Sequence, residues 1–226
     1  DLYAIGAKSQ ILAVDNLSNY PAGTPISEIS AFEPSVEAIL AKKPDLVLLS
    51  IDSTKAPQIR NALTKLGIPV LMEKAPATLQ DVYAENTLLG RVTDRAAGAA
   101  KLNASMAKSI KDVLAKAKKS SKIRIFHELD DTYFSVTSNT FIGKVYKDFG
   151  AINIADAAAG ADNSGYPQLS AEYLLKSDPQ VIFLADAQYG VTAESVSKRA
   201  GWSQISAVKN KKIVELPPDI PSRWGP

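Results

Sequence analysis

Apolar runs and amphipathic segments alternate in the first third of the chain. Residues 46–49 form an uninterrupted apolar run, which is typical of a strand in a parallel sheet that is buried on both faces. Residues 36–41 before this run and 58–66 after it have the spacing of short helices, and Gly67 ends the second of them. Residues 68–72 predict the next strand. This order of helices and strands with short turns predicts an α/β lobe with a parallel sheet.

Two consecutive helices are predicted in the middle of the chain. Thr78 can cap a helix that runs to about Leu89, where Gly90 is the stop signal. Thr93 or Asp94 can cap a second helix, which continues to about residue 118. We expect its apolar positions, spaced by three and four, to face protein: Leu102, Met106, Ile110 and Val113. A helix of about 25 residues is either an ordinary surface helix or a spine between two lobes.

The alternation of strands and helices resumes after this long helix. Strands are predicted at residues 122–127, 181–184 and 212–216, and helices at 141–149 and 193–199. The fold class is therefore α/β, with a long helix between two α/β regions. The predicted organisation is an N-terminal lobe over residues 1–92, a connecting helix over 93–119 and a C-terminal lobe over 120–226.

Two windows of the sequence repeat each other at an offset of 135 residues. Residues 35–49 and 170–184 share five identical positions, and their apolar positions agree without a gap. Each window predicts a serine cap, a two-turn helix, a proline that ends it and a buried strand. That architecture does not require an acid two residues after the cap, yet Glu37 and Glu172 both stand there. The repeat favours two lobes of similar topology, each with one glutamate near a helix start.

Composition and charge limit the possible functions. Lys and Arg number 26 against 24 Asp and Glu, and a net charge of +2 gives no electrostatic case for nucleic-acid binding. The chain has no Cys and a single His, so no metal site of nitrogen and sulfur ligands is expected, and His127 is predicted to be structural. No resident cofactor is indicated, since glycine-rich phosphate loops and catalytic serine motifs are missing. No apolar run approaches the ~20 residues of a membrane span.

The two windows belong to an order of segments that resembles a known family. The flanking segments are residues 2–7, 14–21, 201–202, 207–210 and 222–226. Together they resemble the substrate-binding proteins of ABC importers for ferric siderophores, haem and cobalamin, the class III periplasmic binding proteins. The resemblance covers essentially the whole chain. It implies two Rossmann-like lobes with mostly parallel sheets, joined by one long rigid helix, with the ligand in the cleft between them.

The resemblance also implies where the protein works and with which partner. A monomeric extracytoplasmic protein, in the periplasm or at the cell surface as a lipoprotein, would capture the ligand and deliver it to an ABC permease dimer. Neither an enzymatic activity nor a membrane span of its own is implied. Family members carry a first strand ahead of the helix that here begins at Asp1, and a last helix after the final segment. The resemblance therefore implies that this chain is trimmed at both ends.

Candidate ligand contacts follow from the loops after the predicted strands, because ligands of open α/β sheets bind at the carboxyl ends of strands. Aromatic side chains in these loops can stack on a macrocycle or a catecholate ring. The candidate ligand-binding residues are Tyr20, Asp52, Ser53, Tyr133, Tyr166, Tyr189 and Arg223. The resemblance supports Tyr166 and Arg223 above the others, and Arg223 can pair with ligand carboxylates. It also implies that Glu37 and Glu172 dock on permease arginines, one per subunit.

Two other classes of function stay open. One is an α/β enzyme that uses the same cleft, such as a metal-chelatase-like or dinucleotide-dependent enzyme, although the sequence shows neither a glycine-rich phosphate loop nor an evident acid–base pair. The other is a surface protein that uses its lobes only for protein contacts. The related zinc- and manganese-binding proteins need a His-rich site, which a chain with one His does not supply.

Overall fold

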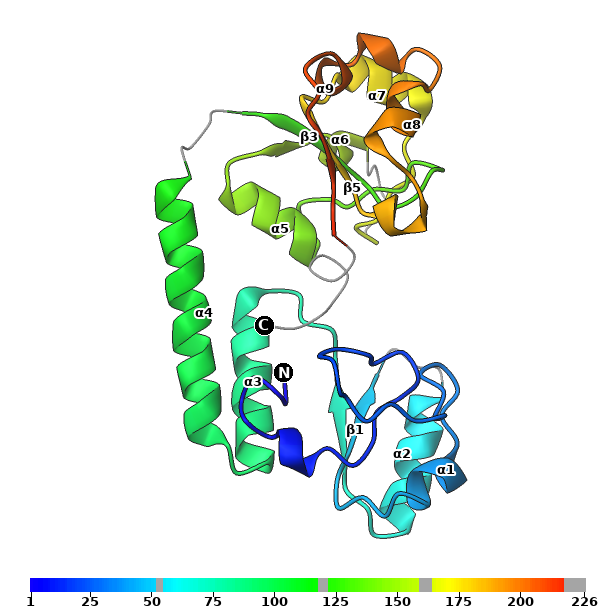
Figure 1. Ribbon diagram of the computed structural model, residues 1–226, viewed down its shortest axis with the longest axis vertical. Coiled ribbons are helices and arrows are strands. Elements are labelled where there is room, and N and C mark those ends of the chain that lie inside the picture. Colours follow the sequence, from blue (N-terminus) through cyan, green and yellow to red (C-terminus); the bar gives the residue numbers. More distant parts are fainter. Residues whose placement is uncertain (52–54, 118–121, 159–163, 218–226) are drawn as a thin grey trace. The chain divides into compact units, whose positions relative to one another are not determined.

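The computed structural model describes residues 1–51, 55–117, 122–158 and 164–217. The chain divides into two compact units, the first comprising residues 1–107 and the second beginning at residue 108. The division falls inside one long helix, α4 (Ala96–Lys116), which is labelled in Figure 1. Three candidate ligand contacts, Asp52, Ser53 and Arg223, lie outside the described residues.

The first unit contains a parallel pair of strands. β1 (Val47–Ser50) and β2 (Val70–Glu73) pair in register, with Val47 opposite Val70 and Ser50 opposite Glu73. α1 (Val36–Leu40) precedes β1, and α2 (Ala56–Lys65) connects the two strands. These bounds agree within two residues with the elements that the apolar pattern predicts, so the α/β character of this region is confirmed.

Alternate residues of the two strands belong to different apolar clusters, as the period of two of a strand requires. Leu49 and Met72 lie in a cluster with side chains of α1 and α2, namely Ile39, Ile59 and Leu63. Leu48 and Leu71 pack against the opposite cluster, which involves α3 (Leu79–Val92), α4 and the N-terminal segment through Ile5, Ala7, Leu89 and Ala99. The pair of strands is therefore covered on both faces.

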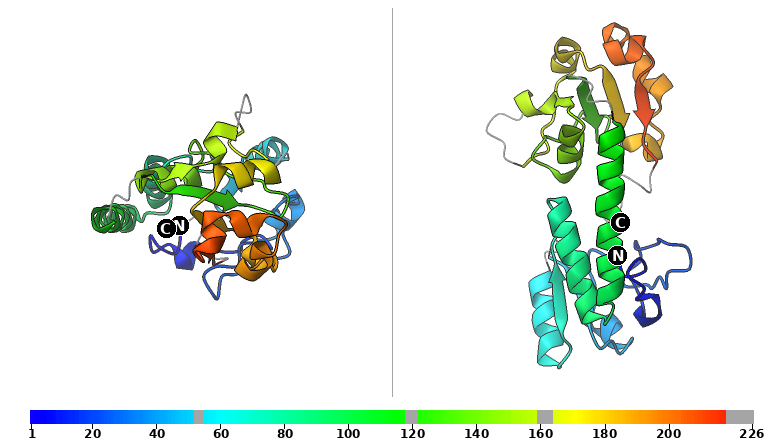
Figure 2. Two further views of the ribbon diagram at one scale, coloured as in Figure 1. Left: turned by 90° about the horizontal axis from the view of Figure 1, so that it is seen from above. Right: turned by 90° about the vertical axis from the view of Figure 1, so that its left-hand side faces the viewer.

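Two close approaches require glycine, one between α3 and α4 at Gly90 and one between α4 and the N-terminal segment at Gly98. Figure 2 shows α3 and α4 side by side. A Cβ at Gly90 would lie 2.6 Å from the Cβ of Ala99, and a Cβ at Gly98 would overlap the carbonyl oxygen of Ile5. The expectation that Gly90 ends the first helix is wrong, because α3 continues to Val92. The absence of a side chain at Gly90 serves close packing between helices rather than chain termination.

The helix α4 is continuous over 21 residues. Leu102, Met106 and Ile110 are partly buried as expected, whereas Val113 is 53% exposed. Asn86 of α3 donates a hydrogen bond to the Sδ of Met106, and Val113 lies about two turns beyond that contact. The expectation that Val113 faces protein is therefore wrong, while the role of α4 as a connector stays a prediction.

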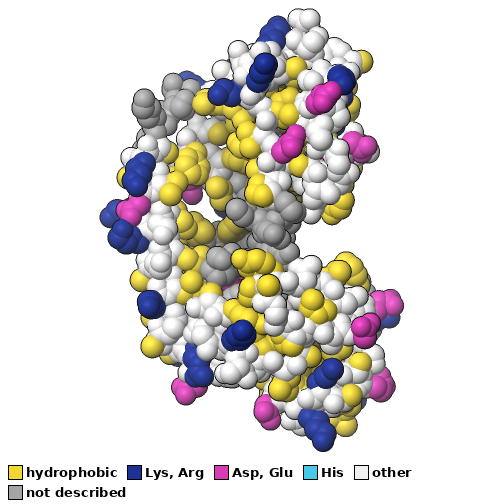
Figure 3. Space-filling model, in the orientation of Figure 1, with side chains coloured by type: hydrophobic (Ala, Val, Ile, Leu, Met, Phe, Trp, Pro, Cys, Tyr) yellow, Lys and Arg dark blue, Asp and Glu magenta, His cyan; other side chains and the backbone are white. Residues whose placement is uncertain are grey.

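Lysines are exposed on the second half of α4. Figure 3 shows basic side chains along this helix, and Lys108, Lys111 and Lys116 are exposed there. Lys108 pairs with Asp112 at 2.6 Å, one turn further on. Positive charge near the carboxyl end of a helix offsets the negative end of its dipole. Lys116, in the last turn, therefore stabilises the helix through its dipole, and Lys108 does so through its ion pair with Asp112.

The second unit contains a four-stranded parallel sheet. Its strands are β3 (Arg124–Glu128), β4 (Ile152–Asn153), β5 (Val181–Leu184) and β6 (Ile213–Glu215), in the spatial order β4-β3-β5-β6. From β3 the chain goes to β4 on one side and then to β5 on the other, so the direction of winding reverses between β3 and β5. The apolar pattern predicts β3, β5 and β6. It misses β4, because two residues are too few to make a recognisable run.

Helices cover both faces of this sheet, as Figure 1 shows. On one face lies α5 (Phe141–Asp148), whose Tyr146 stacks on Phe183 of β5 with 4.9 Å between ring centroids. On the other face, Phe126, Ile182 and Leu184 form a cluster with residues of the remaining helices. These helices are α6 (Ala155–Ala158), α7 (Ala171–Ser177), α8 (Ala193–Ser197) and α9 (Ser206–Lys209).

The two repeated windows fold in the same way. Ser35 caps α1 and Ser170 caps α7, each through a side-chain oxygen that accepts a hydrogen bond from a backbone N–H. The residue before the proline is left-handed in both windows, with φ of +51° at Lys43 and +45° at Asp178. The sequence repeat is therefore a structural repeat that includes an uncommon backbone conformation.

Gly98→Ala should destabilise the first unit. The added methyl group would overlap the Ile5 carbonyl oxygen, and forced overpacking of this kind costs about 1–3 kcal/mol, more than the helix propensity gained. Chemical denaturation followed by circular dichroism measures the change. The exposed Ala104→Ser on the same helix is the control and should shift the free energy of unfolding by less than about 0.5 kcal/mol. A stabilised Gly98→Ala variant would contradict the close approach of α4 to the N-terminal segment.

Candidate functional site

The reversal of winding between β3 and β5 points to the carboxyl edge of the second sheet. Ligands of open α/β sheets bind outside the carboxyl ends of the strands at such a reversal, because the two neighbouring loops diverge there. The loops concerned begin after Glu128, the last residue of β3, and after Leu184, the last residue of β5. They contain Tyr133 and Tyr189, two of the predicted ligand contacts.

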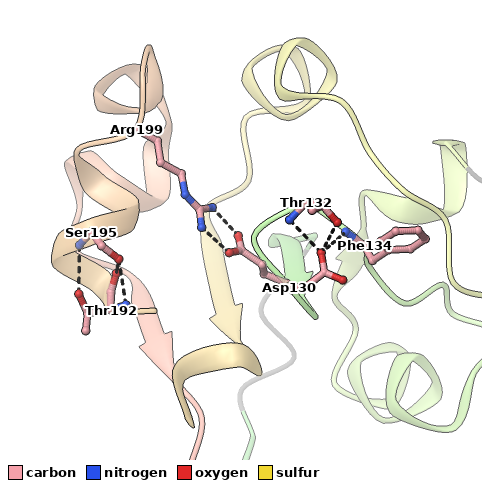
Figure 4. A network of polar contacts seen from close by, with 7 residues as sticks. Asp130, Thr132, Phe134, Thr192, Ser195 and Arg199 are labelled. Carbon is pink, nitrogen blue, oxygen red and sulfur yellow. Dashed lines mark hydrogen bonds and ion pairs between the residues drawn. The ribbon is translucent and has the colours of Figure 1, made fainter. Parts of the chain in front are cut away.

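The loop after β3 is a tight turn stabilised by Asp130. Its Oδ1 accepts hydrogen bonds from the Thr132 backbone N–H at 2.9 Å and from the Thr132 hydroxyl at 2.6 Å, as Figure 4 shows. The Leu129 N–H donates to the Phe134 carbonyl oxygen at 2.9 Å and closes the turn. Tyr133, at the tip, has a left-handed φ of +70°. Its ring packs against the apolar cluster of this unit, whereas Phe134 is 37% exposed.

A second segment pairs with this loop and adds another aromatic side chain. The Thr137 N–H donates to the Gly165 carbonyl oxygen at 2.8 Å, and Phe134 and Gln168 form an antiparallel bridge. Tyr166 lies within the paired segment and is 43% exposed. The structure therefore brings Tyr166 and Phe134 into one pair of hydrogen-bonded segments.

Within the described residues, three exposed rings belong to the loops of this sheet: Phe134, Tyr166 and Tyr189. Tyr189 is 81% exposed in the short helical turn η2 (Asp186–Tyr189), directly after β5. Tyr133 differs from them, because it supports the loop from inside. Phe134 lies in a candidate loop of the sequence analysis but is not among the predicted ligand-binding residues. The adjacent pair Tyr133-Phe134 was its only signal, and that signal does not tell which ring faces outward.

A buried ion pair lies beneath the loop after β3. The Arg199 guanidinium donates two hydrogen bonds to the Glu128 carboxylate, at 2.7 and 2.6 Å, and Figure 4 shows both bonds. The Glu128 side chain is fully buried. The guanidinium also lies over two rings, 4.6 Å from the centroid of Trp202 and 5.5 Å from that of Tyr133. This bidentate pair with two cation–π contacts holds Tyr133, and with it the loop, on the core.

Asp186 adds a second buried carboxyl group to this pair. It is 2% exposed, and among the described residues neither of its side-chain oxygens has a hydrogen-bond partner. Burial raises the pKa of Glu128 to about 7, against the opposing effect of Arg199, and Asp186 raises it further. Burial likewise raises the pKa of Asp186. Sequence reasoning missed this cluster, because Glu128 and Arg199 are 71 positions apart and form no local motif.

His127 is buried on the other face of the sheet. Its Nδ1 lies 2.8 Å from the Tyr146 hydroxyl, and among the described residues its Nε2 has no hydrogen-bond partner. Burial lowers the pKa of His127 to about 4 and raises the pKa of Tyr146. The imidazole is therefore neutral at physiological pH and is a core residue, as the sequence analysis predicts.

The carboxyl edge of the first sheet carries a pocket of about 200 Å³. Its lining comes from the end of β2 and from the start and middle of α3, and includes Met72, Glu73, Lys74, Asp81, Glu85 and Leu88. Burial raises the pKa of Glu73 to about 7, and the neighbouring Glu85 raises it further. The pocket therefore offers a carboxyl group whose charge changes near neutral pH.

Tyr20 lies in the long irregular segment between residue 10 and α1. Its side chain is 64% exposed, and Leu17 and Phe32 in the same segment are 55% and 76% exposed. Asp15 shapes part of the segment, since its Oδ1 accepts a hydrogen bond from the Leu17 N–H at 2.8 Å. Apolar side chains exposed together on one segment are typical of a contact surface.

The two repeated glutamates stand in the first turns of their helices. Glu37 in α1 and Glu172 in α7 are both exposed. Glu37 accepts a hydrogen bond from the Ser35 hydroxyl at 2.7 Å, which lowers the pKa of its carboxyl group. An acidic side chain in the first turn is stabilised by the positive end of the helix dipole. Both side chains are therefore accessible to a partner.

Two kinds of feature are missing from the part of the chain that the structure describes. No three His, Asp or Glu side chains there gather as they would around a metal ion. No helix there combines the length and the apolar character that crossing a bilayer demands. The chemistry that the described edges offer is ring stacking, hydrogen bonding and charge.

Parallel sheets covered on both faces, with exposed rings after the strands, define an α/β binding protein. The chain belongs to the periplasmic binding protein family, whose model, described as "Periplasmic binding protein", matches residues 1–220. The resemblance noted in the sequence is thereby confirmed.

Named relatives agree with this family. An uncharacterized ABC transporter substrate-binding lipoprotein of Bacillus subtilis, YvrC, is 31% identical over 99% of this chain and 71% of its own length. A cobalamin-binding protein of Halobacterium salinarum is 30% identical over 88% of this chain, which spans only 53% of that relative. The crystal structure of a possible iron-binding (periplasmic solute-binding) protein from Staphylococcus epidermidis, 25% identical, covers 99% of this chain and 88% of its own, with a TM-score of 0.80. The predicted α/β fold is confirmed by this likeness.

His127 should not titrate in the folded protein between pH 5.5 and 8. Its pKa is lowered from about 6.5 to about 4. The contribution of this group to the free energy of unfolding is therefore complete above pH 6.5 and is lost as the pH falls from about 6.5 to about 4. The loss should reach up to about 3 kcal/mol. The chain has one His, so a single NMR imidazole signal reports the titration. Tyr146→Phe is the control and should leave the pKa low, because burial is its cause; a midpoint near 6.5 in the wild type would contradict the buried placement.

Proposed function

We propose that the chain is the substrate-binding protein of an ABC importer for a bulky metal chelate, with cobalamin as the leading ligand and haem or a ferric siderophore as the alternatives. The observation that carries the proposal is the match to an ABC transporter substrate-binding lipoprotein, which is 31% identical to this chain over 99% of its length. The cobalamin-binding relative supports the choice of a corrinoid. An extracytoplasmic location, in the periplasm or at the cell surface, follows from this role.

The exposed rings of the second unit suit such a ligand. Phe134 and Tyr189 offer flat surfaces after β3 and β5, and Tyr166 lies in the segment that pairs with the loop after β3. A corrin or porphyrin ring can stack on side chains of this kind. A chelate arrives with its metal already coordinated, so the protein needs no cluster of metal ligands. The single His of the chain is buried against Tyr146 and is not offered to a metal. Tyr20 and, outside the described residues, Asp52, Ser53 and Arg223 complete the proposed contacts.

The same features favour transport over the enzyme alternative. Arg199 and Glu128 are bonded to each other, and both groups lie beneath the loop rather than at its surface. Catalysis by acid and base needs groups within reach of a substrate proton. Family membership points the same way, since its named relatives are binding proteins.

Glu37 and Glu172 are the proposed contacts for the permease dimer. They occupy equivalent, exposed positions at the starts of two helices with the same cap and the same following strand. A permease with two-fold symmetry presents two equivalent surfaces, and one monomeric binding protein can meet both if it carries the same contact twice. Arginine is the expected partner, because its planar fork binds a carboxylate through two hydrogen bonds.

Tyr166→Ala should weaken binding of the preferred ligand about tenfold, or ~1.4 kcal/mol, because a stacking surface is lost. Titration of the purified chain with cobalamin, haem and ferric citrate, followed by calorimetry, identifies the ligand and measures the change. Arg223→Ala should give a similar loss through the ligand carboxylates or phosphate. The matched control is Phe149→Ala: Phe149 is 38% exposed in the same unit but follows the carboxyl end of α5, and its loss should leave affinity unchanged.

Two outcomes would contradict these assignments. Unchanged affinity in both Tyr166→Ala and Arg223→Ala would show that the site lies elsewhere. No binding of any of the three ligands by the wild type would count against the proposed function itself.

Glu37→Gln combined with Glu172→Gln should strongly reduce ligand uptake by cells that express the importer, with ligand affinity unchanged. The melting temperature should change little, because the dipole effect of one exposed first-turn acid is only about 0.3–1 kcal/mol. Glu194→Gln is the matched control, since Glu194 is an exposed acid in the first turn of α8, outside the repeat. Normal uptake by the double variant would refute the docking role.

A further inference from the structure

The cluster of Glu128, Asp186 and Arg199 occupies the point where the winding of the second sheet reverses. Glu128 ends β3, and Asp186 begins η2 two residues after β5. The Ala185 N–H donates to the Glu128 carbonyl oxygen at 2.9 Å, so the backbones also meet there. The two carboxyl groups are close enough to hydrogen-bond when one is protonated. The cluster therefore joins the loop that carries Tyr133 and Phe134 to the turn that carries Tyr189.

The charges of the cluster do not balance when both carboxyl groups are ionised. Arg199 from the end of α8 supplies one positive charge, and its fork is occupied by the two oxygens of Glu128. Among the residues that the structure describes, Asp186 then has no donor, although both of its oxygens are buried. Asp130, in the turn after β3, adds a further negative charge nearby, and Tyr133, from the same turn, faces Arg199 through its ring. The two buried carboxylates then repel each other, because one guanidinium compensates only one of their two charges.

A single proton resolves this imbalance. Bound between Glu128 and Asp186, it turns a repulsive contact into an O–H···O hydrogen bond and gives Asp186 a hydrogen-bond partner. The cluster is then neutral, with one carboxylate and one guanidinium. When the proton leaves to solvent, the buried pair carries one uncompensated negative charge, which is expensive at a site with little water.

We infer that Glu128 and Asp186 share one proton that ties the loop after β3 to the turn after β5, and that its loss above neutral pH loosens the exposed rings of this edge and weakens ligand capture. The part concerning ligand capture rests on the function proposed above. Glu128 and Asp186 touch no ligand in this account and act as positioning residues, through Tyr133 and through the backbone of η2.

The sign of the pH effect follows from the raised pKa values. A carboxyl group whose pKa rises from about 4.5 to about 7 on folding binds more protons in the folded state. Its contribution to stability is complete below about pH 4.5 and is lost as the pH rises through about 7. Because the pair is coupled, the midpoint belongs to both groups together. The lowered pKa of His127 has the opposite effect, because it makes the free energy of unfolding decrease as the pH falls, and only below pH 6.5.

Trp202 gives a local readout of the cluster, because Arg199 lies 4.6 Å from its ring centroid and the ring is 1% exposed. The chain has two Trp, so in a Trp224→Phe background fluorescence reports Trp202 alone. The emission should titrate with a midpoint near pH 7 in the full chain. Asp186→Asn should abolish that titration, since its amide group donates permanently to Glu128 without a charge. Glu194→Gln, an exposed acid on α8, is the matched control and should leave the titration in place.

Either of two results would overturn the inference. One is a Trp202 signal that does not titrate between pH 6 and 8.5, and the other is an Asp186→Asn variant that titrates as the wild type does. If Asp186→Asn fails to fold, Glu128→Gln takes its place and should abolish the Trp202 titration in the same way. The pH dependence of the melting temperature is a further test, because the melting temperature should fall between pH 6 and 8.5. Burial also raises the pKa of Glu73 to about 7, so melting temperatures are compared in a Glu73→Gln background, with and without Asp186→Asn or Glu128→Gln.

The ligand arm separates this inference from the proposed function. With cobalamin, haem or ferric citrate, whichever binds, affinity should fall about 5-fold or more between pH 6 and 8.5 in the wild type and stay constant in Asp186→Asn. Affinity that is independent of pH while Trp202 titrates would refute the link between the cluster and ligand capture. If none of the three ligands binds at any pH, the proposed function fails, and the Trp202 titration still decides whether the proton is shared.

Discussion

Burial of each parallel sheet on both faces is the constraint on which the rest of the structure depends. In the second unit, β3 is buried from Ile125 to Glu128, with α5 on one side and a large apolar cluster on the other. A strand enclosed in this way has room for ligand chemistry only beyond its end. A charge at that end, such as that of Glu128, is tolerable only with a partner, and Arg199 is that partner. The same enclosure leaves His127 neutral.

Local patterns in the sequence were sufficient for every described strand except the two-residue β4 and for the caps Ser35, Thr78 and Ser170. They did not locate the start of α4, which begins at Ala96 rather than directly after Thr93 or Asp94, and they were insufficient for contacts between distant segments. The apolar runs at residues 46–49 and 181–184 predict β1 and β5, because a strand buried on both faces must be apolar at every position. Gly90 was misjudged, since a glycine that permits close helix packing looks the same in sequence as one that ends a helix. The Arg199–Glu128 pair, the outward ring of Phe134 and the reversal of strand order depend on tertiary contacts, which no window of sequence contains.

The aromatic side chains of the second unit divide into two groups with different tasks. Trp202 and Tyr133 lie against the Arg199 guanidinium and are part of the structural support. Phe134, Tyr166 and Tyr189 are exposed and supply the surface on which a flat ligand can rest. A binding protein benefits from this division, because rings that are held in place before the ligand arrives lose little conformational entropy on binding. Membership of the periplasmic binding protein family gives this arrangement a consistent purpose.

The contact between Gly98 and the carbonyl oxygen of Ile5 has a consequence for biogenesis. It joins two positions that are 93 residues apart, and the apolar cluster around Ile5 needs Leu89 and Ala99 as well. The first unit therefore cannot close before Gly98 has been synthesised, which at about 5–20 residues per second takes roughly 5–20 s after Ile5. During that interval the nascent chain lacks part of its core. For a polypeptide that is threaded through a secretion channel, such a delay keeps it in the unfolded state that threading requires.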